Sequence, residues 1–242
     1  MIRFATGLDV YEQRARLIPG LVAGLPLALL SAELGFSNSP LYSLLMSVLV
    51  AVGIPFIVTS WVRFRGLAVQ EALITQWKGM PTIRWLRLND NSFGSRHAVW
   101  RDAMNRLSKK PFPDKLTEAA DPVEADQTYD SAGAIARELT RDSKLHPLVL
   151  MENANYGLER NLVGFQAIGV AISWFCVAAD LAVVGLAAFG KLSLPPTAWI
   201  APTILIVLLA FWWARYPSER RVRDAGERYA ERLFDTIVAM EK

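Results

Sequence analysis

Cysteine and histidine are nearly absent from this sequence, which has one cysteine and two histidines among 242 residues. The lone cysteine, Cys176, excludes an intrachain disulfide. His97 and His146 lie far apart and lack the spacing of metal ligands, and the chain has no G-x-S-x-G elbow, Walker-type glycine loop or H-E-x-x-H motif. The sequence therefore predicts no catalytic residue, no cofactor and no metal site, and we expect that the protein is not an enzyme.

Charged residues make up 20% of the chain, yet they are almost missing from four long apolar stretches. The stretches are residues 17–32, 41–62, 162–189 and 198–214. About 20 apolar residues in a helix cross a hydrocarbon core of about 30 Å, so the pattern predicts a membrane protein with two transmembrane hairpins, residues 17–62 and 162–214. The first stretch is the weakest because it contains Pro19 and Pro26, and a cleaved signal peptide is the alternative there.

Basic residues flank these stretches at one side of the predicted membrane. They precede the first and third stretches and follow the second and fourth, at Arg14, Arg16, Arg63, Arg65, Arg160, Arg215, Arg220 and Arg221. The two other connectors, residues 33–40 and 190–197, share a single lysine. By the positive-inside rule both termini and the middle of the chain are predicted to be cytosolic. The predicted cytosolic segments are residues 1–16, 63–161 and 215–242.

The middle segment has no convincing run of alternating β-branched residues, so we expect an all-α fold. Gly79 is expected to end a helix that continues from the second apolar stretch, and DPVE, residues 121–124, has the N-cap acid and first-turn proline of a helix start. The C-terminal tail spaces six residues as a heptad stripe. They are Val222, Gly226, Tyr229, Leu233, Thr236 and Met240. The stripe packs either on the chain's own cytosolic domain or on a second subunit.

One carboxylate, Asp180, lies inside the third apolar stretch. A charge at membrane depth costs at least about 2.5 kcal/mol on insertion scales, so we expect Asp180 to face the bundle interior or a wet cavity. Glu33 lies at the mouth of the first predicted span on the same side of the bilayer, and in a symmetric oligomer the two residues would form acidic rings that favour cations. Two interpretations stay open: an ion pathway through Asp180 and Glu33, or an Asp180 that only fixes helix packing.

Basic and aromatic residues are concentrated between residues 84 and 110, where the only acids are Asp90 and Asp102. The candidate ligand-binding residues are Arg84, Trp85, Arg87, Arg96, Trp100, Arg101, Lys109 and Lys110. Arginine and lysine neutralise phosphates and tryptophan stacks bases, which favours a nucleotide or oligonucleotide ligand. The alternative is a surface that rests on anionic lipid heads, with the tryptophans in the protein core.

Two stretches, GMPTIRWLRLND at residues 79–90 and MENANYGLERNLVGF at residues 151–165, resemble segments of a group of bacterial membrane proteins. These are small effectors encoded beside nucleotidyltransferases in anti-phage islands, similar to the Hailong-type effector. The resemblance implies an oligomeric ion channel of the bacterial inner membrane, whose cytosolic face binds a short single-stranded DNA made by the partner enzyme. It also implies that this DNA restrains the channel, which opens on infection and depolarises the host.

We therefore expect a homo-oligomer, with a tetramer as the first guess, that is embedded in membrane lipids and acts as a ligand-gated ion-conducting effector. The alternative from a different class is a non-conducting anchor or scaffold that recruits a cytosolic partner. A lipid-modifying enzyme is the third hypothesis and predicts product formation from labelled lipid. Ion flux through liposomes that contain the purified protein separates the first hypothesis from the other two.

Overall fold

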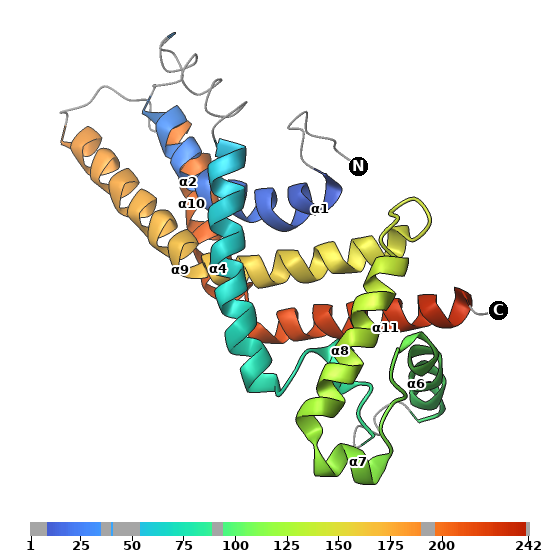
Figure 1. Cartoon of the computed structure of the whole chain (residues 1–242). Coiled ribbons are helices and arrows are strands. Elements are labelled where there is room, and N and C mark those ends of the chain that lie inside the picture. The colour runs from blue at the N-terminus through green and yellow to red at the C-terminus, as the bar shows by residue number, and fades with distance from the viewer. Residues whose placement is uncertain (1–8, 35–39, 41–53, 89–93, 190–196, 241–242) are drawn as a thin grey trace. The chain divides into compact units, whose positions relative to one another are not determined.

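The computed structural model describes residues 9–34, 40, 54–88, 94–189 and 197–240. Every regular element in these ranges is a helix and none is a strand (Figure 1), so the prediction of an all-α fold is confirmed for the described part of the chain. The chain divides into two compact units. The apolar unit comprises Met1–Val69 and Gly157–Glu219, and the charged unit comprises Gln70–Tyr156 and Arg220–Lys242.

The apolar unit is built from the long hydrophobic helices. Its elements are α1 (Val10–Glu12), the π-helical turn η1 (Gln13–Leu17), α2 (Ile18–Glu33), the first part of α4 (Ile54–Trp77), most of α9 (Pro147–Ala188) and α10 (Thr197–Arg215). Asp9 caps the start of α1, because its side chain accepts a hydrogen bond from the amide of Glu12 at 2.7 Å. The continuous run of α1, η1 and α2 therefore begins at Val10, seven residues before the start of the predicted span at residue 17.

Candidate membrane spans follow from the length and composition of these helices. Residues 10–32 and 147–186 are each long and apolar enough to cross a membrane, and residues 200–215 meet the same criterion only when α11 (Glu219–Met240) is counted with them. Most of the second predicted span, residues 41–53, lies outside the described residues. The protein thus has two to three candidate membrane-spanning helices, and the layout with four spans stays a prediction.

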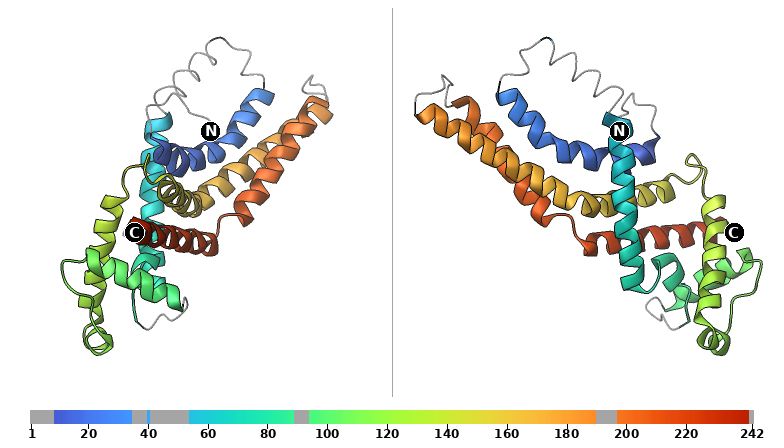
Figure 2. Two further views of the ribbon diagram at one scale, coloured as in Figure 1. Left: turned by 90° about the vertical axis from the view of Figure 1, so that its right-hand side faces the viewer. Right: turned by 60° about the vertical axis from the view of Figure 1, so that its left-hand side comes forward.

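Helix α9 is longer than any single membrane crossing requires (Figure 2). The part of α9 from residue 147 to residue 186, 40 residues long, corresponds to roughly 60 Å at about 1.5 Å per residue, about twice the thickness of a hydrocarbon core. The part from Leu162 to Leu186 contains Asp180 as its only charged residue, whereas Glu152, Glu159 and Arg160 lie in the part before it. The later part of α9 is therefore the membrane candidate.

The charged unit contains shorter, amphipathic helices. They are α5 (Pro81–Arg84), α6 (Ser95–Leu107), α7 (Lys115–Ala120), α8 (Pro122–Leu139) and α11, together with the ends of α4 and α9. Gly79 has φ of 122° just beyond the end of α4, a backbone conformation that glycine adopts without strain. Asp121 accepts a hydrogen bond from the amide of Glu124 at 3.0 Å. Both predicted helix boundaries are therefore confirmed.

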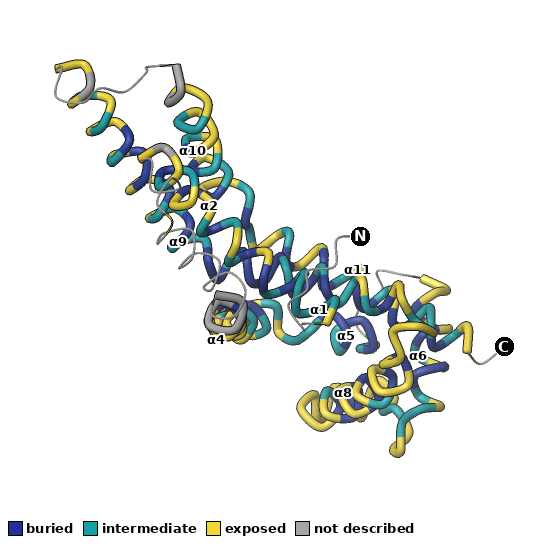
Figure 3. Tube along the Cα trace, turned by 90° about the horizontal axis from the view of Figure 1, so that it is seen from above, coloured by how far each residue is buried: buried dark blue, intermediate teal, exposed yellow. Residues whose placement is uncertain are grey.

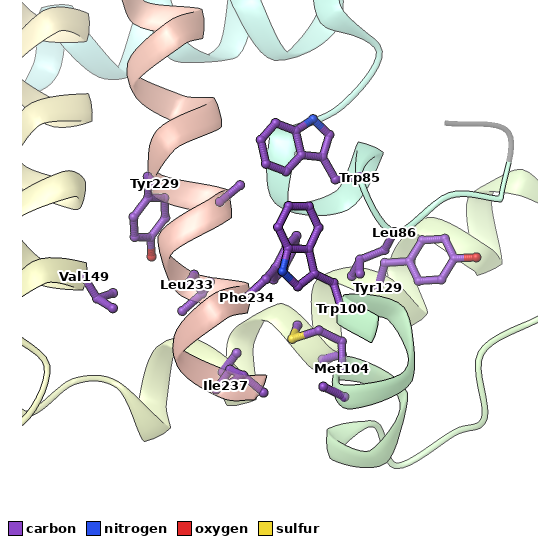
Figure 4. Close-up of a cluster of buried hydrophobic side chains, with 14 of the residues drawn as sticks. Trp85, Leu86, Trp100, Met104, Tyr129, Val149, Tyr229, Leu233, Phe234 and Ile237 are labelled. Atoms are coloured by element: carbon purple, nitrogen blue, oxygen red, sulfur yellow. The ribbon is translucent and has the colours of Figure 1, made fainter. Parts of the chain in front are cut away.

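The core of the charged unit forms where α11 packs on the segment around α5 and on α6 and α8 (Figure 4). The indoles of Trp85 and Trp100 stack with their centroids 5.7 Å apart and their planes within 4°. Leu233 and Phe234 of α11 are fully buried in the same cluster. The first four positions of the predicted stripe, from Val222 to Leu233, are all buried within the chain itself. The stripe therefore packs on its own domain, one of the two alternatives that the sequence left open.

Candidate functional site

The C-terminal half of α9 packs against α2 and α10 through a small apolar cluster. Leu30 of α2, Cys176 and Val177 of α9 and Ile206 of α10 are buried together. Asp180 lies one turn after Cys176, so the two side chains share a face of α9. The cluster therefore sets an apolar environment beside the only carboxylate of this half of the helix.

Asp180 is completely buried, with an exposed fraction of 0%. Neither carboxylate oxygen has a hydrogen-bond partner among the residues that the structure describes. The expectation that Asp180 is sheltered by protein is confirmed, whereas its part in an ion pathway stays a prediction. Buried polar groups are nearly always hydrogen-bonded, so a carboxylate without a partner calls for an explanation.

Glycine lets the turns of α9 before Cys176 pack closely against α10, and a serine lies on the same turns. A Cβ atom on Gly169 would lie 2.2 Å from Cδ2 of Trp213, so only glycine leaves room for this buried indole. Ser173 donates a hydrogen bond to the carbonyl oxygen of Gly169, within the same helix, at 2.7 Å. The hydroxyl of Ser173 is thus engaged locally, whereas the indole nitrogen of Trp213, like the oxygens of Asp180, has no hydrogen-bond partner in the described residues.

The opposite faces of α9 and α10 expose large apolar side chains, and Figure 3 shows exposed and buried turns alternating along both helices. The exposed set includes Trp174, Phe175, Leu181, Val184, Ile200, Ile204, Leu208 and Phe211. Trp174 of α9 and Phe211 of α10 meet edge to face, with ring centroids 5.9 Å apart. An apolar surface of this kind suits lipid or another copy of the chain.

A polar junction joins α9 to the first helical run. Asn161 is fully buried and its side-chain nitrogen donates to the carbonyl oxygen of Ala15 at 2.6 Å. Ala15 lies in the π-helical turn, a geometry that is rare and often found at functional sites. Side chains that reach the backbone of another helix are one cause of such irregular turns. The junction therefore fixes α9 to a specific, non-standard turn of its neighbour.

Glycines bring α4 and α9 into backbone contact beside this junction. A Cβ atom on Gly66 would lie 1.7 Å from Oδ1 of Asn161, and one on Gly164 would lie 2.9 Å from the carbonyl carbon of Arg65. The guanidinium of Arg65 also donates through Nε to the carbonyl oxygen of Gly164 at 3.2 Å. The crossing of α4 and α9 thus tolerates no side chain at either glycine.

The aromatic members of the predicted ligand patch lie in the core of the charged unit. Trp85 and Trp100 are 4% and 2% exposed, and Trp100 donates through its indole nitrogen to Asp235 at 2.8 Å. A base that stacks on either ring would have to displace this core. Trp85 and Trp100 are therefore core residues, as in the alternative given in the sequence analysis.

Two predicted arginines are paired with acids of distant segments. Arg87 makes a bidentate pair with Asp126, with Nε to Oδ1 at 2.8 Å and Nη2 to Oδ2 at 2.7 Å. Its hydrogen bonds with Asp126 raise the pKa of the guanidinium.

Arg96 lies over the ring of Trp100 and pairs with Glu231 at 2.9 Å and Asp235 at 3.0 Å. The hydrogen bonds to these two acids raise its pKa as well. Both cations are already neutralised by the chain.

Arg101 belongs to a buried network around Glu118. It donates to Tyr129 at 2.9 Å and to the carbonyl oxygens of Leu86 and Pro113, and it lies 3.9 Å from Glu118. Glu118 accepts from the amide of Leu88 at 3.0 Å and from the hydroxyl of Tyr129. Burial and the hydrogen bond to Glu118 raise the pKa of Tyr129 to about 12. Arg101 is therefore a structural residue of this core.

The two predicted lysines differ from the arginines because they line a cavity. The cavity has a volume of about 470 Å³ and is bounded by Ser108, Lys109, Lys110, Glu124, Gln127, Thr128, Ser131, Ala134 and Ile135. Lys110 pairs with Glu124 at 3.1 Å, and both side chains are mostly exposed. Lys109 has no ion pair with any residue that the structure describes. Arg84 is not part of the cavity lining.

Glu33 is the last residue of α2, and its side chain lies outside the described part of the structure. The predicted pairing of Glu33 and Asp180 in an ion pathway therefore stays a prediction. The structure places the eight predicted ligand residues in one unit. The two tryptophans are buried, three of the arginines (Arg87, Arg96 and Arg101) are held by acids or carbonyl oxygens of the chain, and the two lysines line the cavity.

Comparisons with known proteins give no family for this chain. No protein-family model, no curated protein and no solved structure matches it. The resemblance to Hailong-type effectors stays a prediction.

Sequence reasoning missed the residues that complete these networks. Asp126 and Asp235 neutralise arginines from 39 and 139 residues away, and Asn161 joins two helices 146 residues apart in sequence. No local motif marks such pairs. A polar Asn161 beside the apolar run of α9 was the one available signal, because an uncharged amide at a helix crossing often bonds a neighbouring backbone.

Proposed function

We propose that this protein is an ion-conducting membrane protein whose conduction is controlled by its charged unit. The observation that supports the proposal most strongly is Asp180, a fully buried carboxylate with no hydrogen-bond partner in the described residues of a candidate membrane helix. Ionisable residues inside membrane segments are rare, and they mark ion pathways, proton relays and similar functional sites.

A purely structural role explains Asp180 poorly. A carboxylate that fixes helix packing does so through hydrogen bonds, as Glu118 does in the charged unit. Asp180 has no such bonds within the described chain, and its burial has an energetic cost that nothing there offsets. A mobile ion that visits the carboxylate supplies the missing interaction.

The burial of Asp180 also favours one location for the pathway. Its side chain is inaccessible within a single chain, which favours a route through the bundle of each subunit over a ring of Asp180 residues between subunits. In the homo-oligomer that we propose, with a tetramer as first guess, the exposed apolar faces of α9 and α10 would contact lipid or the next copy.

Control by a ligand is proposed at the cavity lined by Lys109 and Lys110. Its volume of about 470 Å³ is within the range of small-molecule sites, and the two ammonium groups suit phosphate. A nucleotide or a short single-stranded DNA is therefore the proposed ligand, with a nucleotidyltransferase as its source. Helices α4 and α9 each run without interruption from one unit into the other, so a shift between two arrangements of the charged unit would reach the spans.

The proposed setting is the bacterial inner membrane, with both termini in the cytosol and a role in anti-phage defence. The gene neighbourhood tests this setting directly. An adjacent nucleotidyltransferase supports it, and a neighbourhood of unrelated metabolic genes argues against it.

Flux measurements test the proposed function. The full chain is reconstituted in liposomes that hold a membrane potential, which a voltage-sensitive dye reports with and without nucleotides or short single-stranded DNA. We expect the potential to dissipate in at least one condition, and we expect Lys109→Gln with Lys110→Gln to abolish the difference between conditions. Lys144→Gln, an exposed lysine outside the cavity, is the matched control. A potential that persists in every condition would contradict the proposal.

A second candidate is a non-conducting anchor that recruits a partner to the charged unit. Large apolar side chains at Leu116 and Val123 are 82% and 67% exposed, which favours a protein contact there. This candidate predicts that a partner is retained after mutations in the spans and that expression leaves the membrane potential intact.

A further inference from the structure

We infer that the ion which meets Asp180 is a proton. The inference rests on the proposed function and names its substrate. It follows from what surrounds Asp180 and from how many oxygen ligands different cations require.

The neighbouring turn of α9 presents carbon and sulfur rather than oxygen. Cys176 and Val177 on the preceding turn are buried against Leu30 of α2 and Ile206 of α10. A cation stripped of water needs several oxygen ligands, six to eight for Ca²⁺ and an octahedron for Mg²⁺. This apolar cluster cannot replace a hydration shell.

The other oxygen-bearing side chains of the same half of α9 lie at a distance from Asp180. Ser173 is seven residues before Asp180, about 10 Å along the helix axis, and its hydroxyl is engaged with the carbonyl oxygen of Gly169. Within the described residues no three His, Cys, Asp or Glu side chains come together as a metal site. One carboxylate alone is a poor site for a metal cation but a sufficient site for a proton.

Among the described residues of α2, α9 and α10, no cationic side chain pairs with Asp180. In α2 the candidate is Glu33, an acid whose side chain is not described, and in α10 it is Arg215. Arg215 lies nine residues beyond Ile206, about 13 Å along the helix. In α9 the nearest titratable side chain is the buried thiol of Cys176. Neutralisation of Asp180 therefore falls to a mobile charge.

The exchange is balanced in atoms and charge. A proton from water binds one carboxylate oxygen and gives a neutral carboxylic acid, which suits the apolar cluster. Release of that proton to water on the other side regenerates the carboxylate. No oxidant, reductant or further reactant takes part.

Vesicles without small inorganic cations test the inference. The full chain is reconstituted with N-methylglucamine and gluconate as the only bulk ions, and a trapped pH dye reports acidification after an external pH step. We expect proton flux in this medium, under the ligand condition that permits conduction, and we expect Asp180→Asn to reduce it at least tenfold. Asp180→Glu, which keeps a proton-binding carboxyl group, should retain a measurable part of it.

The possible failures are distinguishable. Flux that appears only after Na⁺ or K⁺ is added overturns the proton assignment and leaves the proposed function intact. Absence of flux for every ion contradicts the proposed function itself. Thermal unfolding of Asp180→Asn, measured in the same preparation, shows whether a lost flux reflects a lost fold.

An infrared measurement gives a readout other than flux. The carbonyl stretch of a protonated carboxylic acid is separate from the carboxylate bands. We expect a pH-dependent band of this kind in the wild-type protein that is missing in Asp180→Asn. Proton flux through Asp180→Asn at the wild-type rate, or a difference spectrum without this band, overturns the inference.

Discussion

Two buried carboxylates of this chain have opposite surroundings. Glu118, in the charged unit, is 6% exposed and accepts hydrogen bonds from a backbone amide and a tyrosine hydroxyl, with Arg101 nearby. Asp180, in the apolar unit, is 0% exposed and its two oxygens have no partner in the described part of the chain. Glu118 therefore stabilises the fold through its hydrogen bonds, whereas Asp180 is buried without such stabilising contacts.

The difference follows from how each unit satisfies its polar groups. In the charged unit, arginines and acids from distant segments neutralise one another, so burial of charge is compensated. In the apolar unit, Asn161 is satisfied by a backbone carbonyl, whereas Nε of Arg16, the indole nitrogen of Trp213 and both oxygens of Asp180 are buried without a hydrogen-bond partner in the described residues. Asp180 is the one carboxylate among these groups, and it is where we place the function.

The largest expected effect is the loss of Glu118. Glu118→Ala should lower the free energy of unfolding of the charged unit by about 3 kcal/mol, because it leaves the buried Arg101, Tyr129 and the amide of Leu88 without their acceptor. Chemical denaturation followed by tryptophan fluorescence measures the change. Glu124→Ala, which removes an exposed ion pair, is the control. Equal effects of the two substitutions would refute the distinction between buried and exposed acids.

A close helix crossing in the apolar unit should be nearly as sensitive. Gly66→Ala places a Cβ atom 1.7 Å from Oδ1 of Asn161 and should cost about 2 to 3 kcal/mol through overpacking. Gly24→Ala is the matched control, since a Cβ atom there would have no neighbour within 4 Å and alanine favours a helix. Thermal unfolding in detergent compares the two variants. A Gly66→Ala protein as stable as Gly24→Ala would show that this crossing is not close packed.

Alkaline pH should weaken the charged unit through Tyr129. The pKa of its hydroxyl is raised from 10.0 to about 12 in the fold, so the fold favours the protonated form. The resulting stability is fully present below pH 10 and is lost as the pH rises through about 12, a change of about 2 to 3 kcal/mol. Denaturation between pH 9 and about 12 measures it, and Tyr129→Phe should flatten the decline. An unchanged slope in Tyr129→Phe would rule out this origin.

The smallest effect belongs to an exposed pair. Arg141 lies 3.3 Å from Glu138 on the surface, and both side chains are more than 70% exposed. Arg141→Ala should change the free energy of unfolding by at most about 0.5 kcal/mol. Denaturation at low and high salt checks this value, and a loss above 1 kcal/mol in either buffer would contradict it.

The sequence predicted the helices well because helix caps, stops and buried stripes depend on residues that are close together in the chain. The cap at Asp121, the stop at Gly79 and the buried stripe from Val222 to Leu233 all follow from residues within a few turns. The burial of Asp180 followed from the cost of charge in an apolar stretch.

The candidate ligand site was harder to predict because pairing is not local. Composition between residues 84 and 110 indicated a free cationic patch, but Arg87 and Arg96 meet acids 39 and 139 residues away. Only the fold brings those segments together. Lys109 and Lys110 are exposed and line the cavity beside α8.

A single pair of measurements on Asp180→Asn tests the central claim, that this carboxylate serves ion movement and not stability. Thermal unfolding and ion flux are recorded on the same reconstituted protein. The account predicts a melting temperature equal to or above that of the wild type, together with a loss of flux. A lower melting temperature with flux per folded protein unchanged would contradict it.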